Sequence, residues 1–429
     1  MLLTLAPATS CMVILLLALA GLAVAFGVTA VATPAVRRFA TDRTWHDSPD
    51  GQRKLHKVPT PSAGGLAIFA GVVAGLACVA AASALLGGPT LGLHPIVYLG
   101  AIAMVAVGAY DDTRGLGFKP KLLVECVVAF ALIHAGYRID VSGLVGTDPS
   151  TAMLYSFPLT VLWIVGVINA VNLIDGVDGL AAGISAIAFA SLAVVFGLAG
   201  NLPAVLVAVV VIGALTGFLM YNFNPASIFM GDSGSLFLGY GLAVFALSGQ
   251  SLADSRLAPL VPAIALGLPL LDTALSMARR VAERKAIFAP DCDHIHHRMV
   301  ARFPVRRAVV TLYGVAAFFG VAAVAVSVSP AAQGLMFSVG TVGAALGLVA
   351  MLGYVRRPYV QPQLRLIERP GHTAAQPPPP VTTDEKSPAI TAQAAVRGSG
   401  DGAQWPASAE RGNPHTWTGP GPTLRVRQE

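Results

Sequence analysis

The segment 169–183 combines two asparagines and two aspartates between two long apolar runs of the chain. These four residues are Asn169, Asn172, Asp175 and Asp178. Ionisable groups within a membrane protein are costly, so they are retained mainly where they bind a ligand or do chemistry. We therefore expect this segment to bind a polar ligand.

The spacing of these polar residues indicates how they are arranged. In a continuous helix the two asparagines and Asp175 would share one face, with Asp178 next along it. Gly176 and Gly179 are expected to break the helix so that the backbone approaches a ligand closely. A structural turn between two spans is the alternative, but a turn does not require four side chains of these types.

A second acidic motif ends the third apolar segment of the chain, at Asp111 and Asp112. Adjacent carboxylates repel each other, which suits one of them to hold a proton or to bind Mg²⁺. Lys119 and Lys121 begin the next apolar segment, and we take Lys119 as a substrate-binding candidate. The alternative is a pair that ends a helix, followed by solvated lysines.

The segment 222–235 places Asp232 at the entrance to another apolar run, beside small residues. Exposed amides at a helix N-terminus and a carboxylate are suited to a pyrophosphate and its metal ion. Asn224 in the same segment is a further substrate-binding candidate. A plain helix cap would have a similar sequence and remains the alternative.

Two motifs are basic. The segment 50–65 has a run of cations and ends in Gly64 and Gly65, whose free backbone amides are suited to bind phosphate. A charge cluster that only sets topology is the alternative. The segment 291–299 carries His294, His296, His297 and Arg298.

These imidazole and guanidinium groups are expected to face a diphosphate. A zinc site is less consistent with the segment, because it lacks paired ligand modules at separated positions. A solvated loop is the other alternative.

The elements that position these motifs are membrane spans. The 429-residue chain is 55% hydrophobic and only 12% charged, about half the charge of a soluble domain, which argues against a soluble α/β protein. We predict an all-α polytopic membrane protein with about eleven transmembrane helices, ten being the alternative count. The apolar segments are 11–35, 62–86, 94–110, 121–137, 156–173, 179–199, 202–222, 234–250, 257–279, 308–328 and 333–354.

The distribution of basic residues predicts the topology. Lysine and arginine cluster in the loops 36–61, 111–120 and 280–307, which the positive-inside rule places in the cytoplasm. The N-terminus is then outside, the C-terminus is cytoplasmic, and the motifs lie on the cytoplasmic face. The first segment is expected to be a retained span, because no basic residue precedes it as in a signal peptide.

The composition changes near residue 357, and this change divides the chain. We predict an integral membrane catalytic domain at 1–357. The tail at 358–429 is rich in Pro, Gly and Ala and is expected to be disordered and cytoplasmic.

The five motifs, in their order along residues 35–310, resemble those of the polyprenyl-phosphate N-acetylhexosamine-1-phosphate transferases, glycosyltransferase family 4. The His-Ile-His-His-Arg sequence is similar to the WecA/TagO-like branch. The resemblance implies transfer of N-acetylglucosamine-1-phosphate from UDP-GlcNAc to undecaprenyl or decaprenyl phosphate with release of UMP, the first membrane step of cell-envelope polysaccharide synthesis. It also implies a multi-pass protein of the bacterial inner membrane with a cytoplasmic active site.

The resemblance also implies residue roles. Asn172 and Asp232 match metal-binding positions for Mg²⁺, with Mn²⁺ as a substitute. Asp111 and Asp112 match an acidic pair that handles the lipid phosphate or its proton, and Asp175 lies near the phosphates. Asp178 matches a position associated with the uracil base, and the 294–298 group matches a loop that contacts the diphosphate and sugar.

The expected partners are the UDP-sugar donor, the polyprenyl phosphate acceptor and membrane lipids, with a homodimer as an option and no nucleic acid. An MraY-like enzyme acting on UDP-MurNAc-pentapeptide is the alternative within the enzyme class. An ion-coupled transporter is the alternative outside it, although transporter sites usually lie near the bilayer midplane between repeats. Phosphoryl transfer needs mainly positioning and charge neutralisation, and we expect one-step attack rather than a covalent carboxylate intermediate.

Overall fold

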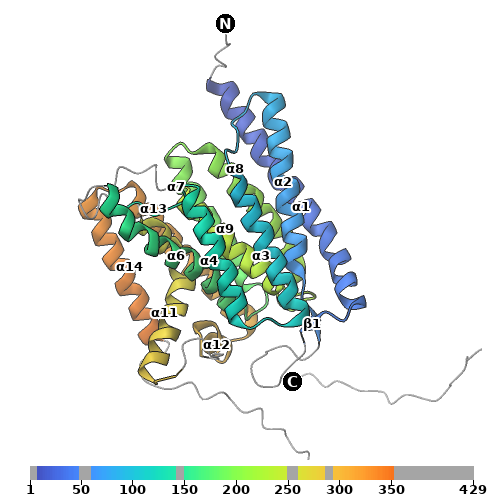
Figure 1. Ribbon diagram of the computed structural model, residues 1–429, viewed down its shortest axis with the longest axis vertical. Coiled ribbons are helices and arrows are strands. Elements are labelled where there is room, and N and C mark those ends of the chain that lie inside the picture. Colours follow the sequence, from blue (N-terminus) through green and yellow to red (C-terminus); the bar gives the residue numbers. More distant parts are fainter. Residues whose placement is uncertain (1–6, 48–58, 142–148, 249–258, 286–292, 352–429) are drawn as a thin grey trace, which may run out of the picture. The chain divides into compact units, whose positions relative to one another are not determined.

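The computed structural model describes residues 7–47, 59–141, 149–248, 259–285 and 293–351, all within the unit Met1–Gln363 (Figure 1). The predicted tail and the basic residues at 50–58 lie outside this part of the chain. The helices are α1 (Pro7–Asp42), α2 (Gly64–Leu86), α3 (Pro95–Arg114), α4 (Phe118–His134), α6 (Pro149–Ile174), α7 (Leu180–Leu198), α8 (Leu202–Asn222), α9 (Gly231–Leu247), α10 (Leu260–Ala265), α11 (Gly267–Ala282), α12 (Ile295–Val300), α13 (Val305–Val328) and α14 (Ala331–Met351). Two short strands, β1 (His46–Asp47) and β2 (Thr60–Pro61), pair antiparallel.

Helices account for all the apolar segments that the sequence predicts, so the all-α multi-pass architecture is confirmed. Among the described residues, eight helices are long and apolar enough to cross a membrane. Three predicted spans fall short of that standard. Helices α4 and α9 have only 17 residues each, and the third is the segment 257–279.

The prediction of one helix over 257–279 is wrong. The structure divides the described part of this segment between α10 and α11, with Leu266 between them. Pro269 explains the break, because a proline has no N–H to donate to the carbonyl four residues earlier and its ring collides with that carbonyl. Helix α11 also carries Arg279 and Arg280 in its last turn.

Helix α9 lies in the interior of the bundle, and other helices pack around it (Figure 1). Nearly all its residues from Ser233 to Leu247 are buried, and it packs against α2, α3, α6 and α7. A Cβ atom on Gly108 of α3 would overlap the backbone of Asp232 and Ser233, at the start of α9. This close approach brings the C-terminal end of α3 against the N-terminus of α9.

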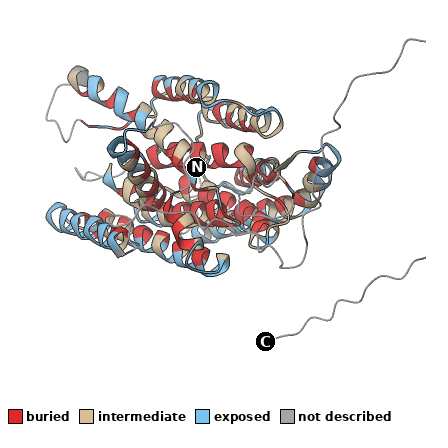
Figure 2. Cartoon of the chain, turned by 90° about the horizontal axis from the view of Figure 1, so that it is seen from below, coloured by how far each residue is buried: buried red, intermediate tan, exposed pale blue. Residues whose placement is uncertain are grey.

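The outer surface of the bundle is apolar. Figure 2 shows the buried residues gathered on the inner helices and the exposed residues on the outer faces. The exposed side chains include large apolar ones such as Val31 of α1 and Met336 of α14. Such faces are suited to contact lipid tails, which are as apolar as leucine.

Candidate active site

A cavity of about 680 Å³ opens where the C-terminal ends of α3, α6 and α8 meet the N-terminus of α9. All five predicted motifs contribute to its wall, together with β1 and the start of α13. The lining residues are His46, Asp47, Thr60, Ser62, Asp111, Asp112, Asn172, Asp175, Gly176, Val177, Asp178, Asn222, Asn224, Pro225, Ala226, Phe229, Met230, Gly231, Asp232, His297 and Val305. The helix ends therefore bring polar segments that are far apart in the sequence into one cavity.

Asp112 joins α3 to α9. Its Oδ1 accepts the amide N–H of Asp232 at 2.8 Å, and its Oδ2 accepts that of Ser233 at 3.1 Å. A carboxylate is stabilised at a helix N-terminus by the unpaired amides and the helix dipole. Gly231 has φ of +72°, a left-handed conformation that favours glycine and turns the chain into α9.

The expectation that these amides form an open pyrophosphate cradle is therefore wrong for Asp232 and Ser233, because Asp112 already binds both. The expectation that the amides of Gly64 and Gly65 are free to bind phosphate is also wrong. The amides of Gly64 and Gly65 donate to the carbonyls of Phe229 and Met230, at 2.9 and 2.8 Å. They tie α2 to the loop that precedes α9 and are not free for phosphate.

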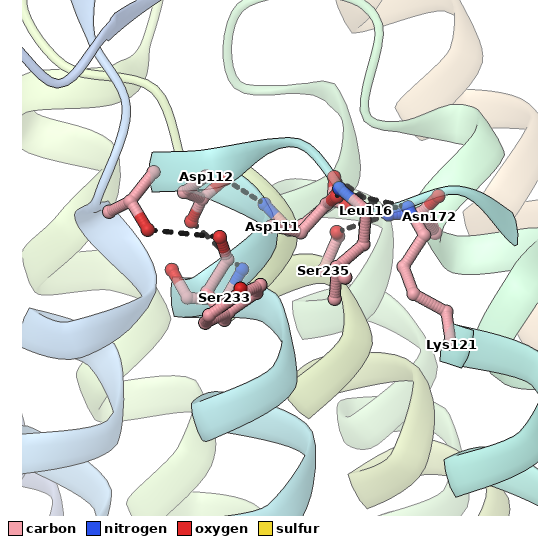
Figure 3. Close-up of polar contacts among 10 residues, drawn as sticks. Asp111, Asp112, Leu116, Lys121, Asn172, Ser233 and Ser235 are labelled. Atoms are coloured by element: carbon pink, nitrogen blue, oxygen red, sulfur yellow. Dashed lines mark hydrogen bonds and ion pairs between the residues drawn. The ribbon is translucent and has the colours of Figure 1, made fainter.

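Lys121 of α4 forms ion pairs with two carboxylates of the site (Figure 3). Its Nζ lies 2.9 Å from Asp111 Oδ2 and 2.7 Å from Asp232 Oδ2. Asp111 Oδ1 also accepts the amide of Leu116. Lys119, which the sequence favoured, is exposed and does not line the cavity.

The two asparagines of the opening segment have different partners. Asn172 Nδ2 donates to Asp232 Oδ1 at 3.2 Å and to Ser235 Oγ at 2.8 Å, and its amide oxygen takes part in neither bond. Asn169 Nδ2 instead donates to Glu125 Oε2 of α4 at 2.5 Å, and Asn169 does not line the cavity. Asn172, Asp175 and Asp178 all line the cavity, but α6 ends at Ile174, so the two aspartates lie on the loop after the helix and not on a common helical face.

The loop 175–179 is held against the loop 223–230. Asp178 Oδ2 accepts the side-chain N–H of Asn224 and the amide of Ala226, both at 2.9 Å. The buried Asn222 accepts the amide of Gly179 at 3.1 Å and donates to the carbonyl of Ile228 at 2.9 Å. These four bonds give one wall of the cavity a fixed shape.

Asp175 is half-buried in that wall. Burial, followed by the negative charges of Asp232, Asp112 and Asp178, raises the pKa of Asp175 well above its usual range. A carboxyl with a raised pKa holds its proton at a higher pH, which suits it to proton exchange with a bound phosphate.

The histidine motif lies partly behind the wall. His297 lines the cavity, whereas His294 and His296 are buried with exposed fractions of 3% and 1%. Arg298 is also buried and forms two 2.6 Å hydrogen bonds to Asp293. Of the four side chains expected to face a diphosphate, the structure brings His297 into the cavity lining.

The oxygen atoms of the cavity fit a hard cation. In the described part of the chain no three His, Cys, Asp or Glu side chains form a closed metal site. Mg²⁺ does not need one, because it is commonly bound by one or two carboxylates together with substrate phosphates and water. Asp232 and Asn172 are in contact and carry carboxylate and amide oxygens of the kind that Mg²⁺ prefers. Asn172 Nδ2 and Lys121 Nζ occupy the two Asp232 oxygens here, so a metal ion would replace one of these donors.

Comparison with known proteins agrees with this site. Residues 94–250 match the model of glycosyl transferase family 4. A probable undecaprenyl-phosphate N-acetylglucosaminyl 1-phosphate transferase of Bacillus subtilis is 38% identical over 296 residues, which cover 68% of this chain and 80% of that protein.

More distant relatives carry related names. A decaprenyl-phosphate N-acetylglucosaminephosphotransferase of Mycobacterium tuberculosis is 32% identical over 334 residues, or 70% of this chain and 81% of that protein. A phospho-N-acetylmuramoyl-pentapeptide-transferase of Halalkalibacterium halodurans is 28% identical over 281 residues, or 62% and 83%. Because the similarity to the Bacillus protein extends over most of both chains, this multi-pass membrane protein belongs to glycosyl transferase family 4.

Proposed function

We propose that this protein transfers N-acetylglucosamine-1-phosphate from UDP-GlcNAc to a polyprenyl phosphate, releasing UMP. The observation that carries the proposal is a polar cavity, at one end of the spans, that residues of all five motifs line. A sugar nucleotide enters such a cavity from water, while a lipid phosphate reaches it from the membrane surface. The names of the relatives that are 38% and 32% identical support this donor and acceptor.

Residues in the cavity lining, and Lys121 in contact with two of them, set the charge of the cavity. Lys121 offsets the two carboxylates Asp111 and Asp232, so that an anionic substrate meets less repulsion. Asn172 and Asp232 are the residues we expect to hold Mg²⁺. When bound, Mg²⁺ would neutralise the diphosphate and stabilise the leaving group.

The reaction we propose is one in-line displacement. An oxygen of the lipid phosphate forms a bond to the β-phosphorus of the UDP-sugar. The bond from that phosphorus to the bridging oxygen breaks, and UMP leaves with the bridging oxygen. The ionised form of Asp175 is suited to take up a proton that the lipid phosphate brings, because burial and the neighbouring negative charges raise the pKa of this carboxyl and make it a stronger base.

The contacts of the carboxylates favour this route over a covalent intermediate. Both oxygens of Asp111 are engaged, one by Leu116 and the other by Lys121. A sugar-phosphoryl enzyme trapped when UDP-sugar is supplied without lipid would contradict the one-step route.

The test of the function is an assay of the purified protein with polyprenyl phosphate, Mg²⁺ and a panel of UDP-sugars. We expect UMP release and a lipid-linked product with UDP-GlcNAc. Release with UDP-MurNAc-pentapeptide instead would establish the MraY-like alternative. No release with any donor, from protein that is folded, would reject the transferase proposal and favour a transporter.

Asp232→Asn tests the metal site within the same assay. This change keeps the side-chain size but removes the charge, so we expect activity to fall by about 100-fold or more because electrostatic stabilisation is lost. The Mg²⁺ concentration for half-maximal rate should also rise. Asp47→Asn, in β1 and in the lining of the same cavity, is the matched control. If the Mg²⁺ concentration for half-maximal rate rose equally in both variants, Asp232 would not be part of the proposed metal site.

We further propose that the protein lies in the bacterial inner membrane with this cavity on the cytoplasmic face. The basic loops of the sequence support that orientation through the positive-inside rule.

A further inference from the structure

Asp272 is a buried carboxylate on α11 that lies outside the cavity lining and that the proposed reaction does not use. Its exposed fraction is 2%. Its Oδ1 accepts the amide N–H of Ile295 at 2.7 Å. Its Oδ2 lies 3.3 Å from Nδ1 of His294 and 3.4 Å from Nδ1 of His296.

This arrangement favours a proton on the imidazole nitrogen nearest the carboxylate. A carboxylate only accepts hydrogen bonds, and an unprotonated Nδ1 facing it would place two lone pairs against each other. At 3.3 and 3.4 Å neither Nδ1 forms a well-aligned hydrogen bond in this structure, but the nearby carboxylate favours Nδ1–H on both rings, as the aspartate of a catalytic triad favours one tautomer of its histidine. The two rings lie nearly parallel, at 9° and with centroids 5.4 Å apart, so one carboxylate orients both.

The opposite edge of His296 points at the cavity wall. Its Nε2 is buried and, like its Nδ1, forms no hydrogen bond within the described structure, but Nδ1 has the Asp272 carboxylate nearby. A Cβ atom on Gly176 would lie 2.8 Å from this Nε2, and Gly176 lines the cavity beside Asp175. The imidazole thus spans the space between Asp272 and the back of the 175–179 loop.

We propose that Asp272 is a positioning residue of the transferase. It anchors the N-terminus of α12, fixes His296 with Nδ1–H toward the carboxylate, and directs Nε2 at the 175–179 loop. A negative charge at Asp272 also balances any positive charge that the imidazole gains when an anionic diphosphate binds in front of this loop. The link to a diphosphate rests on the proposed function, whereas the orientation of His296 does not.

The first test measures the orientation directly. In protein labelled with ¹⁵N-histidine, the His296 signals are identified by their loss in His296→Gln. We expect a protonated Nδ1 in the wild-type protein and a shift toward the Nε2–H form in Asp272→Asn, because an asparagine offers only one acceptor oxygen. A wild-type His296 with unprotonated Nδ1 would overturn the proposal even if Asp272→Asn failed to fold.

The second test is a double-mutant cycle on activity. Partners that orient a functional histidine typically contribute about 10- to 100-fold, so we expect Asp272→Asn to lower kcat by that factor with a smaller change in the KM for UDP-GlcNAc. If Asp272 acts through His296, Asp272→Asn should cost much less in the His296→Gln background. Equal costs in both backgrounds would show a role independent of His296 and overturn the proposal.

Asp293→Asn is the matched control for a general disturbance of the loop. Asp293 holds the same segment through Arg279 and Arg298, whereas the carboxylate that faces Nδ1 of both imidazoles is that of Asp272. We expect its effect to be additive with that of His296→Gln and to leave the ¹⁵N pattern of His296 unchanged. The ¹⁵N result judges Asp272 even if the wild-type protein released no UMP, so failure of this proposal and failure of the proposed function are distinguishable.

Discussion

At the scale of single residues, neighbouring polar groups in the cavity have different hydrogen-bond and ion-pair partners and therefore different roles. Both carboxylate oxygens of Asp112 accept backbone amides at the start of α9, so this side chain links α3 to α9. Asp111, one residue earlier, shares the Lys121 ammonium with Asp232. The adjacent carboxylates predicted as a catalytic pair thus bind different elements.

Lys121→Met tests the charge that links Asp111 to Asp232. It keeps most of the side-chain length but leaves the two carboxylates without their shared cation, so we expect kcat/KM to fall by about 100-fold, as when a charge-stabilising group is removed from an active site. Steady-state kinetics with UDP-GlcNAc measure the change. Lys119→Met tests the residue that the sequence favoured, and the exposed position of Lys119 predicts the smaller loss. A larger loss at Lys119 would contradict the arrangement around Lys121.

At the scale of elements, the cavity depends on how closely other helices approach α9. Gly108 lets α3 contact the backbone at the start of α9, so that Asp112 reaches two amides there. The 175–179 loop in turn contacts the loop 223–230 through Asn222 and Asp178. Each wall of the cavity is therefore set by contacts between helix ends.

Gly108→Val tests the contact between α3 and α9. The added side chain would overlap the backbone of Asp232 and Ser233, so we expect overpacking to destabilise the protein by about 1–3 kcal/mol. A lower melting temperature in detergent and loss of UMP release are the measurements. Gly166→Val on α6 is the matched control, because a Cβ atom there meets no other atom within 4 Å. Equal destabilisation by both changes would show that the close approach at Gly108 is unimportant.

At the scale of the whole molecule, the cavity lies at one end of the candidate spans. Asp111 and Asp112 occupy the last turn of α3, whereas Asp232 occupies the first turn of α9. Transporter sites usually lie near the middle of the bilayer, between related repeats. A site at the ends of spans is suited to an enzyme that joins a soluble donor to a membrane lipid.

Cysteine labelling tests the orientation of that end. Thr90 is an exposed residue in the connection that precedes α3, and Arg114 is the exposed last residue of α3, at its opposite end. In a background without the four native cysteines, a membrane-impermeant thiol reagent should label Thr90→Cys in intact cells. It should label Arg114→Cys only after the membrane is opened. The reverse pattern would place the cavity outside the cytoplasm and contradict the proposed supply of UDP-GlcNAc.

Local sequence patterns identified the polar motifs and their places at the ends of apolar segments. The 169–183 segment and Asp232 were found this way, because charged groups next to long apolar runs are rare. The break in the segment 257–279 was not predicted, because average hydropathy does not show where a proline interrupts a helix. Pro269 was nevertheless a signal that the sequence offered. Lys119 rather than Lys121 was chosen as the substrate-binding candidate, because spacing along the chain does not show which lysine faces inward.

The sequence by itself determined an all-α membrane protein, the segments that supply the site and the family to which the chain belongs. These follow from composition, apolar length and motif order, which are local properties of the chain. Only the tertiary structure decided that Lys121 meets Asp232, that Asp112 binds the start of α9 and that Asp272 faces two histidines. Such contacts depend on where helices cross, and helix crossings are set by side-chain packing across the whole bundle.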